Sequence, residues 1–292
     1  MKQKALFIGL GTMGYHMAGH LSKNTDIELS VFNRTTEKVK KWQSEFKGDT
    51  VSSPKEEVNN FDIIILCAGR DEDMREIFFD PEIGIASNIK PGAIVIDHTT
   101  LSYEMTLKLA TQLEKNNVAF VDAPVSGGEI GAQNGVLSIM AGGKESTINQ
   151  LKPLLNFYAK NITLMGDVGT GQLTKMANQI CVTGVLQGLS EALIFAESND
   201  LDADKLLSAI SGGAAGSWQM DNRLKTMHQR AFDFGFAIKW MIKDLSYALN
   251  KAKANQLDLA FTQKVYKQYQ DLSNKGCANF DTSALILSKE KN

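Results

Sequence analysis

The sequence is poor in the residues that cross-link chains or coordinate metals. Its three cysteines, Cys67, Cys181 and Cys277, are an odd number at wide spacing, without a Cys-x-x-Cys pair. This pattern argues against a disulfide framework and against a structural zinc site, so no metal ligand is predicted. Scattered cysteines fit a reducing environment, and we therefore expect a cytoplasmic protein.

An excess of charge and long apolar runs are also missing. The formal net charge of -2 offers no basic surface for nucleic acid or anionic membranes. No uninterrupted apolar stretch reaches about 18 residues, so we expect no membrane span. The first apolar run is short and ends at glycines, unlike a secretory signal peptide. The 292 residues, 43% of them hydrophobic, suit two domains that each bury a core.

A glycine motif near the start is the most informative positive feature. The apolar run 5–8 is followed by Gly9-Leu10-Gly11-Thr12-Met13-Gly14, the Gly-x-Gly-x-x-Gly fingerprint of dinucleotide binding. The first glycine allows a tight turn, the second lets the backbone approach a pyrophosphate, and the third lets the helix pack closely on the strand. All six residues are predicted cofactor contacts.

The first half of the chain alternates between two patterns. β-rich runs lie at 5–9, 29–33, 61–68, 93–97, 118–125, 136–141 and 161–165. Amphipathic, charge-bearing stretches lie between several of them, at 12–23, 36–46, 71–79, 103–116 and 145–158. This alternation predicts a parallel sheet covered by helices on both faces. The run Phe61–Cys67 is almost continuously apolar, as expected of a central strand.

Strand signals end near Gly166. From Gln172 to about Asn199 apolar residues recur at steps of three and four, which predicts a long helix buried on several sides. Further helices are expected at 203–210, 221–229, 237–254 and 259–274. The predicted fold class is α/β, with an N-terminal Rossmann domain over residues 1–165 and an all-α domain over residues 166–292.

A second cofactor signal follows the second predicted strand. An acidic residue roughly 20 residues past the glycines favours NAD, because it binds the ribose 2′-hydroxyl. Here the strand ends in Asn33-Arg34-Thr35, which are predicted to contact the cofactor and could donate hydrogen bonds to a 2′-phosphate. NADP(H) is therefore the preferred cofactor and NAD(H) the alternative. The competing interpretation is that Arg34 is only a solvated loop cation.

Four further segments complete a recognisable set: Asp97–Thr100, Asp122–Gly128, Gly169–Gln179 and Lys239–Leu245. With the glycine motif and its helix, they resemble the β-hydroxyacid dehydrogenase family in order and spacing over essentially the whole chain. That family includes 3-hydroxyisobutyrate dehydrogenase, tartronate semialdehyde reductase and the glyoxylate/succinic semialdehyde reductases.

The resemblance implies a role for individual residues and for the second domain. Lys175 would be the catalytic acid/base, and the helical domain would serve substrate binding and dimerisation. The substrate contacts, for a small carboxylic acid, would be Ser126, Gly127, Gly128, Asn178 and Gln179. Further cofactor contacts would be Cys67, Ala68, Thr100 and Lys243. Two departures stand out: Gln179 where asparagine is common, and Tyr103 where proline is common.

The chemistry agrees with this assignment. Interconverting an alcohol and an aldehyde needs a hydride carrier, one acid/base group and an anchor for the carboxylate. Lys175, Asn178 and Gln179 are spaced i, i+3 and i+4, so a helix places them on one face. By itself a lysine such as Lys175 is more often a helix-surface cation, but its setting between Gly-x-Gly and Asn-Gln in an apolar helix reverses that expectation.

We therefore predict an NADP(H)-dependent oxidoreductase that interconverts a small β-hydroxy acid, resembling 3-hydroxyisobutyrate, and its semialdehyde. The alternatives are a glyoxylate/succinic semialdehyde reductase and a catalytically silent cofactor-binding scaffold. Lys175 argues against an imine reductase, and the chain is short for a phosphogluconate dehydrogenase. A homodimer or homotetramer is expected. Trp218 and Phe236 are left open between pocket and packing roles. The role of His98 is also open, but a catalytic one is not favoured because the lysine already fills it.

Overall fold

The computed structural model describes residues 2–290, which divide into two compact units between Lys175 and Met176. The last strand ends at Gly166, next to the predicted boundary at 165/166. The division itself lies ten residues later, inside helix α8 (Thr170–Ser198). The first turns of α8 belong to the first unit because the side chain of Gln172 and the amine of Lys175 are hydrogen-bonded there.

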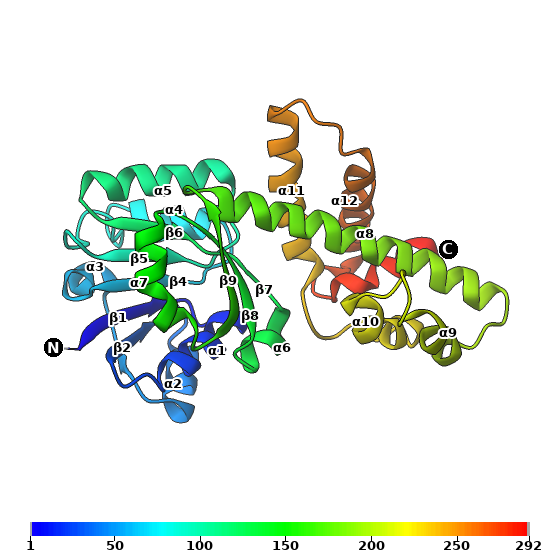
Figure 1. Ribbon diagram of the computed structural model, residues 1–292, viewed down its shortest axis with the longest axis horizontal. Coiled ribbons are helices and arrows are strands. Elements are labelled where there is room, and N and C mark those ends of the chain that lie inside the picture. Colours follow the sequence, from blue (N-terminus) through cyan, green and yellow to red (C-terminus); the bar gives the residue numbers. More distant parts are fainter. Residues whose placement is uncertain (1, 291–292) are drawn as a thin grey trace. The chain divides into compact units, whose positions relative to one another are not determined.

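Within residues 2–290 the strands of the first unit form one nine-stranded sheet (Figure 1). The strands are β1 (Gln3–Ile8), β2 (Ile27–Phe32), β3 (Asp49–Thr50), β4 (Ile63–Leu66), β5 (Ile94–Asp97), β6 (Ala119–Asp122), β7 (Val125–Ser126), β8 (Leu137–Gly142) and β9 (Ala159–Gly166). Their order is β3-β2-β1-β4-β5-β6-β8-β7, with β9 paired to β8. The predicted central strand, β4, lies between β1 and β5.

Helices cover both faces of this sheet because successive strand residues point to opposite sides. In β1, Ala5 and Phe7 enter one core with α1 (Thr12–Leu21), α2 (Thr36–Glu45), α6 (Gly128–Gln133) and α7 (Glu145–Leu155). Leu6 and Ile8 enter the other core with α4 (Asp71–Phe79) and α5 (Tyr103–Lys115). A short α3 (Pro54–Glu57) and the 3-10 turn Val58–Asn60 precede β4.

The prediction of a parallel sheet holds for β1 to β6 but is wrong at its far side. There β8 pairs antiparallel with β6 and β7 and parallel with β9. The connection from β7 to β8, residues 127–136, is too short for a parallel crossover, which needs about a dozen residues or more. The chain therefore turns back on itself, and the sheet is mixed.

The second unit is helical over its described residues. After α8 come α9 (Ala203–Ile210), α10 (Trp218–His228), α11 (Ile238–Ala254), α12 (Ala260–Leu272), a π turn (Ser273–Cys277) and a 3-10 segment (Thr282–Lys289) that the sequence did not predict. Leu186, Leu189 and Leu193 of α8 lie in the core of this unit. In the described part of the chain, α8 is the one helix long and apolar enough to cross a membrane, a property that core helices share.

Candidate active site

The glycine turn between β1 and α1 has the shape that a pyrophosphate requires. Gly9 has φ +105°, a region that L side chains rarely adopt. A Cβ at Gly14 would overlap the carbonyl oxygen of Gly9 and lie 3.0 Å from the Phe7 ring, so this glycine permits the close packing of helix on strand. A Cβ at Gly11 would meet no atom within 4 Å, so the backbone there is open to a ligand. These residues therefore fit a dinucleotide.

The end of β2 is tied to this turn by Asn33. Its Oδ1 accepts a hydrogen bond from the Leu10 N–H at 2.9 Å, and its Nδ2 donates to the Thr35 carbonyl oxygen at 3.2 Å. Arg34 is exposed, and its guanidinium reaches α4, with Nη1 3.0 Å from Glu76 Oε2. The residues expected at the adenosine ribose therefore lie beside the glycine turn.

Two neighbouring strands end at the same edge. Cys67 follows β4, and a Cβ at Gly9 would overlap its carbonyl oxygen, so Cys67 lies directly behind the turn. Ala68 donates its N–H to Thr99 Oγ1 at 2.9 Å, which links the end of β4 to the end of β5. Thr100 follows Thr99 in the chain and is half-buried. In open α/β sheets ligands bind at the carboxyl ends of the strands, where these residues lie.

Asp122, the last residue of β6, fixes the start of α8. Its fully buried carboxylate accepts hydrogen bonds from the N–H groups of Gly169 at 2.7 Å and Gln172 at 2.9 Å. Burial raises the pKa of Asp122 to about 6, against the opposing effect of these hydrogen bonds. A Cβ at Gly142 or Gly171 would overlap Asp122 or its surroundings, so both glycines make room for this contact.

Gln172 attaches the same helix to the end of β5. Its Nε2 donates to the Thr99 carbonyl oxygen at 2.7 Å, and its Oε1 accepts from the Leu101 N–H at 3.1 Å. The Tyr103 ring packs against Gly169, where a Cβ would lie only 2.6 Å from Cε2. The tyrosine that replaces proline therefore contacts the turn that begins α8.

Lys175 lies one turn further along α8 and is 8% exposed. Its Nζ donates to the carbonyl oxygen of Val125 at 2.9 Å, immediately before Ser126. Gly127 and Gly128 follow with φ +127° and +63°, and a Cβ at Gly128 would meet no atom within 4 Å. The structure thus brings the predicted acid/base group to the turn predicted to hold a carboxylate.

His98 belongs to the sheet's interior. Its Nδ1 is 2.6 Å from the Ala123 carbonyl oxygen, and its Nε2 is 2.8 Å from the Tyr158 hydroxyl. With the carbonyl as acceptor, Nδ1 carries the proton and Nε2 accepts from the tyrosine. Burial lowers the pKa of His98 to about 4, so the imidazole is neutral at pH 7. These contacts are those of a packing residue.

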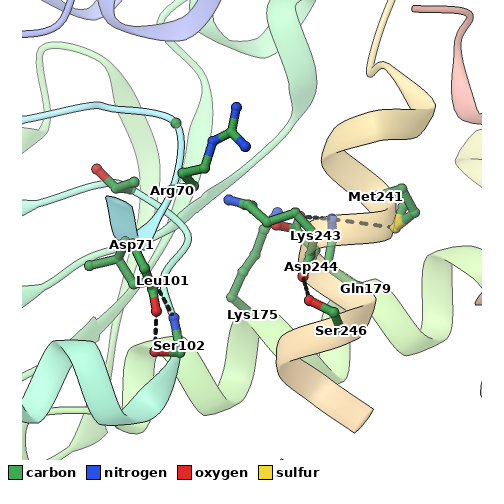
Figure 2. Close-up of polar contacts among 12 residues, drawn as sticks. Arg70, Asp71, Leu101, Ser102, Lys175, Gln179, Met241, Lys243, Asp244 and Ser246 are labelled. Atoms are coloured by element: carbon green, nitrogen blue, oxygen red, sulfur yellow. Dashed lines mark hydrogen bonds and ion pairs between the residues drawn. The ribbon is translucent and has the colours of Figure 1, made fainter. Parts of the chain in front are cut away.

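The second unit carries the other predicted contacts in one chain of two hydrogen bonds and an ion pair. Asn178 Nδ2 donates to Gln179 Oε1 at 2.8 Å, and Gln179 Nε2 donates to Asp244 Oδ2 at 2.6 Å. The Lys243 amine is 3.2 Å from Asp244 Oδ1. Figure 2 shows Gln179 of α8 pointing toward Met241 and Asp244 of α11. Gln179 is buried, so the glutamine that departs from the usual asparagine joins α8 to α11.

Comparison with known proteins places these features in a family. Residues 4–166 match the model of the NAD binding domain of 6-phosphogluconate dehydrogenase, and residues 169–288 match that of the NAD-binding region of NADP-dependent 3-hydroxyisobutyrate dehydrogenase. An uncharacterised oxidoreductase of Shewanella frigidimarina is 45% identical over 288 residues, 99% of this chain and 98% of its own. The 2-hydroxy-3-oxopropionate reductase of Escherichia coli is 34% identical, covering 97% of this chain and 96% of its own.

A solved structure agrees with these relatives. The 3-hydroxyisobutyrate dehydrogenase of Mycobacterium tuberculosis, with L-serine, matches with a TM-score of 0.89 and 25% identity over 100% of both chains. The chain belongs to the β-hydroxyacid dehydrogenase family. It is therefore an NAD(P)-dependent oxidoreductase that acts on a CH–OH group, with the Rossmann and helical parts that the sequence predicted.

Two aromatic residues that the sequence left open lie in the second unit of this dehydrogenase. The half-exposed Trp218 ring has the Arg223 guanidinium carbon 4.9 Å from its centroid. Phe236 is 37% exposed, and its N–H donates to Asp281 Oδ2 at 2.9 Å. Asp281 also pairs with Arg223 at 3.2 Å. Asp281 therefore contacts the Phe236 backbone directly and is joined to the Trp218 ring through Arg223.

Sequence reasoning missed the residues that position the dehydrogenase's Lys175. Asp122 and Gln172 belong to recognised segments, but the sequence analysis gave them no role. The acceptor on Val125 is a backbone carbonyl, so the identity of that residue does not reveal it. A carboxylate directly after a buried strand, opposite a Gly-x-Gly helix start, is the pattern that could have identified Asp122. Glu76 and Asp73, which approach Arg34, carry no such signal because they are 40 or so positions away.

Proposed function

We propose that the protein is an NADP(H)-dependent dehydrogenase for a small β-hydroxy acid of the 3-hydroxyisobutyrate type, with Lys175 as general acid/base. The observation that carries this proposal is the hydrogen bond from the buried Lys175 amine to Val125, next to Ser126–Gly128. An amine held there lies beside the backbone that would bind the substrate's carboxylate. The substrate named for the E. coli relative and the L-serine of the M. tuberculosis structure are also small hydroxylated acids or their oxo forms.

The reaction divides between cofactor and protein. The bound nicotinamide would give or take the hydride. In reduction the Lys175 ammonium donates a proton to the developing alkoxide, and in oxidation the neutral amine accepts the hydroxyl proton. The hydrogen bond to the Val125 carbonyl supports this role because it directs the amine toward Ser126–Gly128. Gly9–Gly14 would hold the pyrophosphate, and Arg34 would face the 2′-phosphate.

A steady-state panel tests the proposal. The substrates are 3-hydroxyisobutyrate, L-serine, glyoxylate, succinic semialdehyde and tartronate semialdehyde, each with NAD(H) and NADP(H). We expect the highest kcat/KM with NADP(H) and with 3-hydroxyisobutyrate or its semialdehyde. A maximum with glyoxylate or succinic semialdehyde would favour the reductase alternative, and no absorbance change with any pair would favour the silent scaffold.

The exposed face of α8 supports a homo-oligomer. Its exposed positions spaced three or four residues apart include Ala177, Cys181, Val185, Gly188, Ala192 and Phe195, and Glu191 is the one exposed charged residue between 177 and 195. Phe195 is 67% and Val185 39% exposed. Such a stripe is typical of subunit contacts. We propose a dimer or tetramer that uses it, and Val185→Glu should lower the mass measured by light scattering; an unchanged mass would exclude this face.

The cysteines are consistent with the cytoplasmic location that we propose. Within residues 2–290, Cys67, Cys181 and Cys277 form no disulfide bond. Free thiols persist where glutathione and thioredoxin keep cysteines reduced.

A further inference from the structure

Arg34 is already paired with acidic side chains of another element. Its Nη1 lies 3.0 Å from Glu76 Oε2, and its Nη2 lies 4.0 Å from Asp73 Oδ1. Both carboxylates belong to α4, which follows β4, whereas Arg34 follows β2. The guanidinium assigned above to a 2′-phosphate therefore has two negatively charged neighbours in the first unit.

The two carboxylates differ in what else they do. Asp73 Oδ2 accepts hydrogen bonds from the N–H groups of Gly69 at 3.2 Å and Arg70 at 3.1 Å, so it also caps the start of α4. Glu76 lies one turn further along the helix, and its Oε2 receives the hydrogen bond from Arg34. Replacing Glu76 thus changes the partner of Arg34 while leaving the cap intact.

We propose that Glu76 is a specificity-determining residue that competes with the 2′-phosphate of NADP(H) for Arg34. The inference rests on the proposed use of NADP(H). A phosphate monoester carries about -1.5 to -2 charge at pH 7 and binds a guanidinium through two parallel hydrogen bonds. Each N–H of Arg34 held by Glu76 is withheld from the phosphate, and the carboxylate repels the phosphate as well. NAD(H) has no such group, so Glu76 reduces the discrimination between the cofactors.

The size of the effect follows from exposure. The Arg34 side chain is 75% exposed and that of Glu76 42% exposed, so solvent screens their attraction. Exposed ion pairs of this kind shift equilibria by a factor of about two to five. Releasing Arg34 should therefore tighten NADPH binding by about two- to five-fold, and more at low ionic strength than at high.

Equilibrium binding without substrate tests this directly. NADPH and NADH are titrated into the full-length protein and followed by nicotinamide fluorescence. Glu76→Gln should bind NADPH about two- to five-fold more tightly and NADH as before. The matched control is Glu72→Gln, which removes the same charge from the same helix and should move NADPH binding less. Equal effects of Glu76→Gln and Glu72→Gln would overturn the proposal.

Arg34→Gln separates this inference from the proposed cofactor. It should weaken NADPH binding at least about tenfold while leaving NADH binding nearly unchanged. If the ratio of the two dissociation constants stays as in the wild type, the assignment of Arg34 to NADP(H) fails, and this inference fails with it. If Arg34→Gln acts as expected but Glu76→Gln does not, only the inference fails.

The double variant distinguishes competition from plain repulsion. If Glu76 acts mainly by occupying Arg34, Glu76→Gln should change NADPH binding clearly less in the Arg34→Gln background than in the wild type. An effect of undiminished size in that background would mean that the carboxylate acts on the phosphate without Arg34, and would refute the competition.

Discussion

The Lys175 amine donates a hydrogen bond to the Val125 carbonyl oxygen at 2.9 Å. This one contact joins the second turn of α8 to the segment that runs from β6 into Ser126–Gly128. Asp122, three residues before Val125, accepts two hydrogen bonds from the start of the same helix. The segment after β6 thus contacts both the start of α8 and the Lys175 amine. Two separate sets of hydrogen bonds therefore position the proposed acid/base group.

Replacing Lys175 by methionine should abolish most turnover and leave cofactor binding intact. Loss of a positioned acid/base group lowers kcat by about 10²- to 10⁴-fold. Single-turnover and steady-state rates with the best substrate of the panel measure the loss, and fluorescence titration with NADPH serves as the control. Wild-type turnover in this variant would remove Lys175 from the mechanism.

Asp122 makes stability depend on pH in an unusual direction. Burial raises its pKa from 3.8 to about 6, so between these values the folded protein binds more protons than the unfolded chain. The contribution of Asp122 to the unfolding free energy therefore falls as the pH rises from about 4 to 6, by up to about 3 kcal/mol.

Asp122→Asn should lack this component. Urea unfolding of both proteins at several pH values between 4 and 7 gives the difference in unfolding free energy. That difference should move in favour of the variant as the pH rises, and two parallel curves would contradict the buried, shifted carboxyl group.

Tyr158→Phe should destabilise the protein without changing catalysis. It removes the hydroxyl that donates to His98 Nε2 and leaves a buried acceptor unsatisfied, at a cost of about 1–3 kcal/mol. Because His98 is a packing residue, kcat should stay within about twofold of the wild type. A large fall in kcat, with the unfolding free energy unchanged, would instead give His98 a catalytic role.

His98 also predicts a loss of stability in acid. Burial lowers its pKa from 6.5 to about 4, so the unfolded chain binds more protons between these values. The stability that His98 contributes is fully present above pH 6.5 and is lost as the pH falls toward 4. His98→Asn should remove this pH dependence, as measured by the difference between its urea unfolding curves and those of the wild type.

Gln179→Asn should lower the stability of the second unit, although asparagine is common at this position in the family that the sequence resembles. The shorter side chain cannot reach Asp244, and a hydrogen bond to a charged group is worth about 1.5–3 kcal/mol. A double-mutant cycle with Asp244→Asn measures the coupling by thermal unfolding. A coupling energy near zero would show that the 2.6 Å contact contributes nothing to stability.

The sequence determined the fold class and the list of motifs, because both depend on the pattern of residues that are close together in the chain. The alternation of apolar runs and amphipathic stretches placed helices such as 71–79 and 203–210 at the bounds that the structure shows. The glycine motif predicted a turn at Gly9 because its physical requirement, a positive φ, is local. The antiparallel strands β7 and β8 escaped prediction, since pairing direction depends on how a short connection turns.

Tertiary structure alone decided which groups each candidate touches. The sequence predicted Arg34 as a cofactor contact, with a solvated cation as the alternative, yet residues about 40 positions away provide carboxylate neighbours for it. Asp122, Gln172 and the Val125 carbonyl position Lys175 over separations of 50 to 73 residues. A hydrogen bond joins atoms about 3 Å apart in space, whatever their separation in the sequence. It produces no periodic pattern of residues, so no local pattern could reveal these contacts.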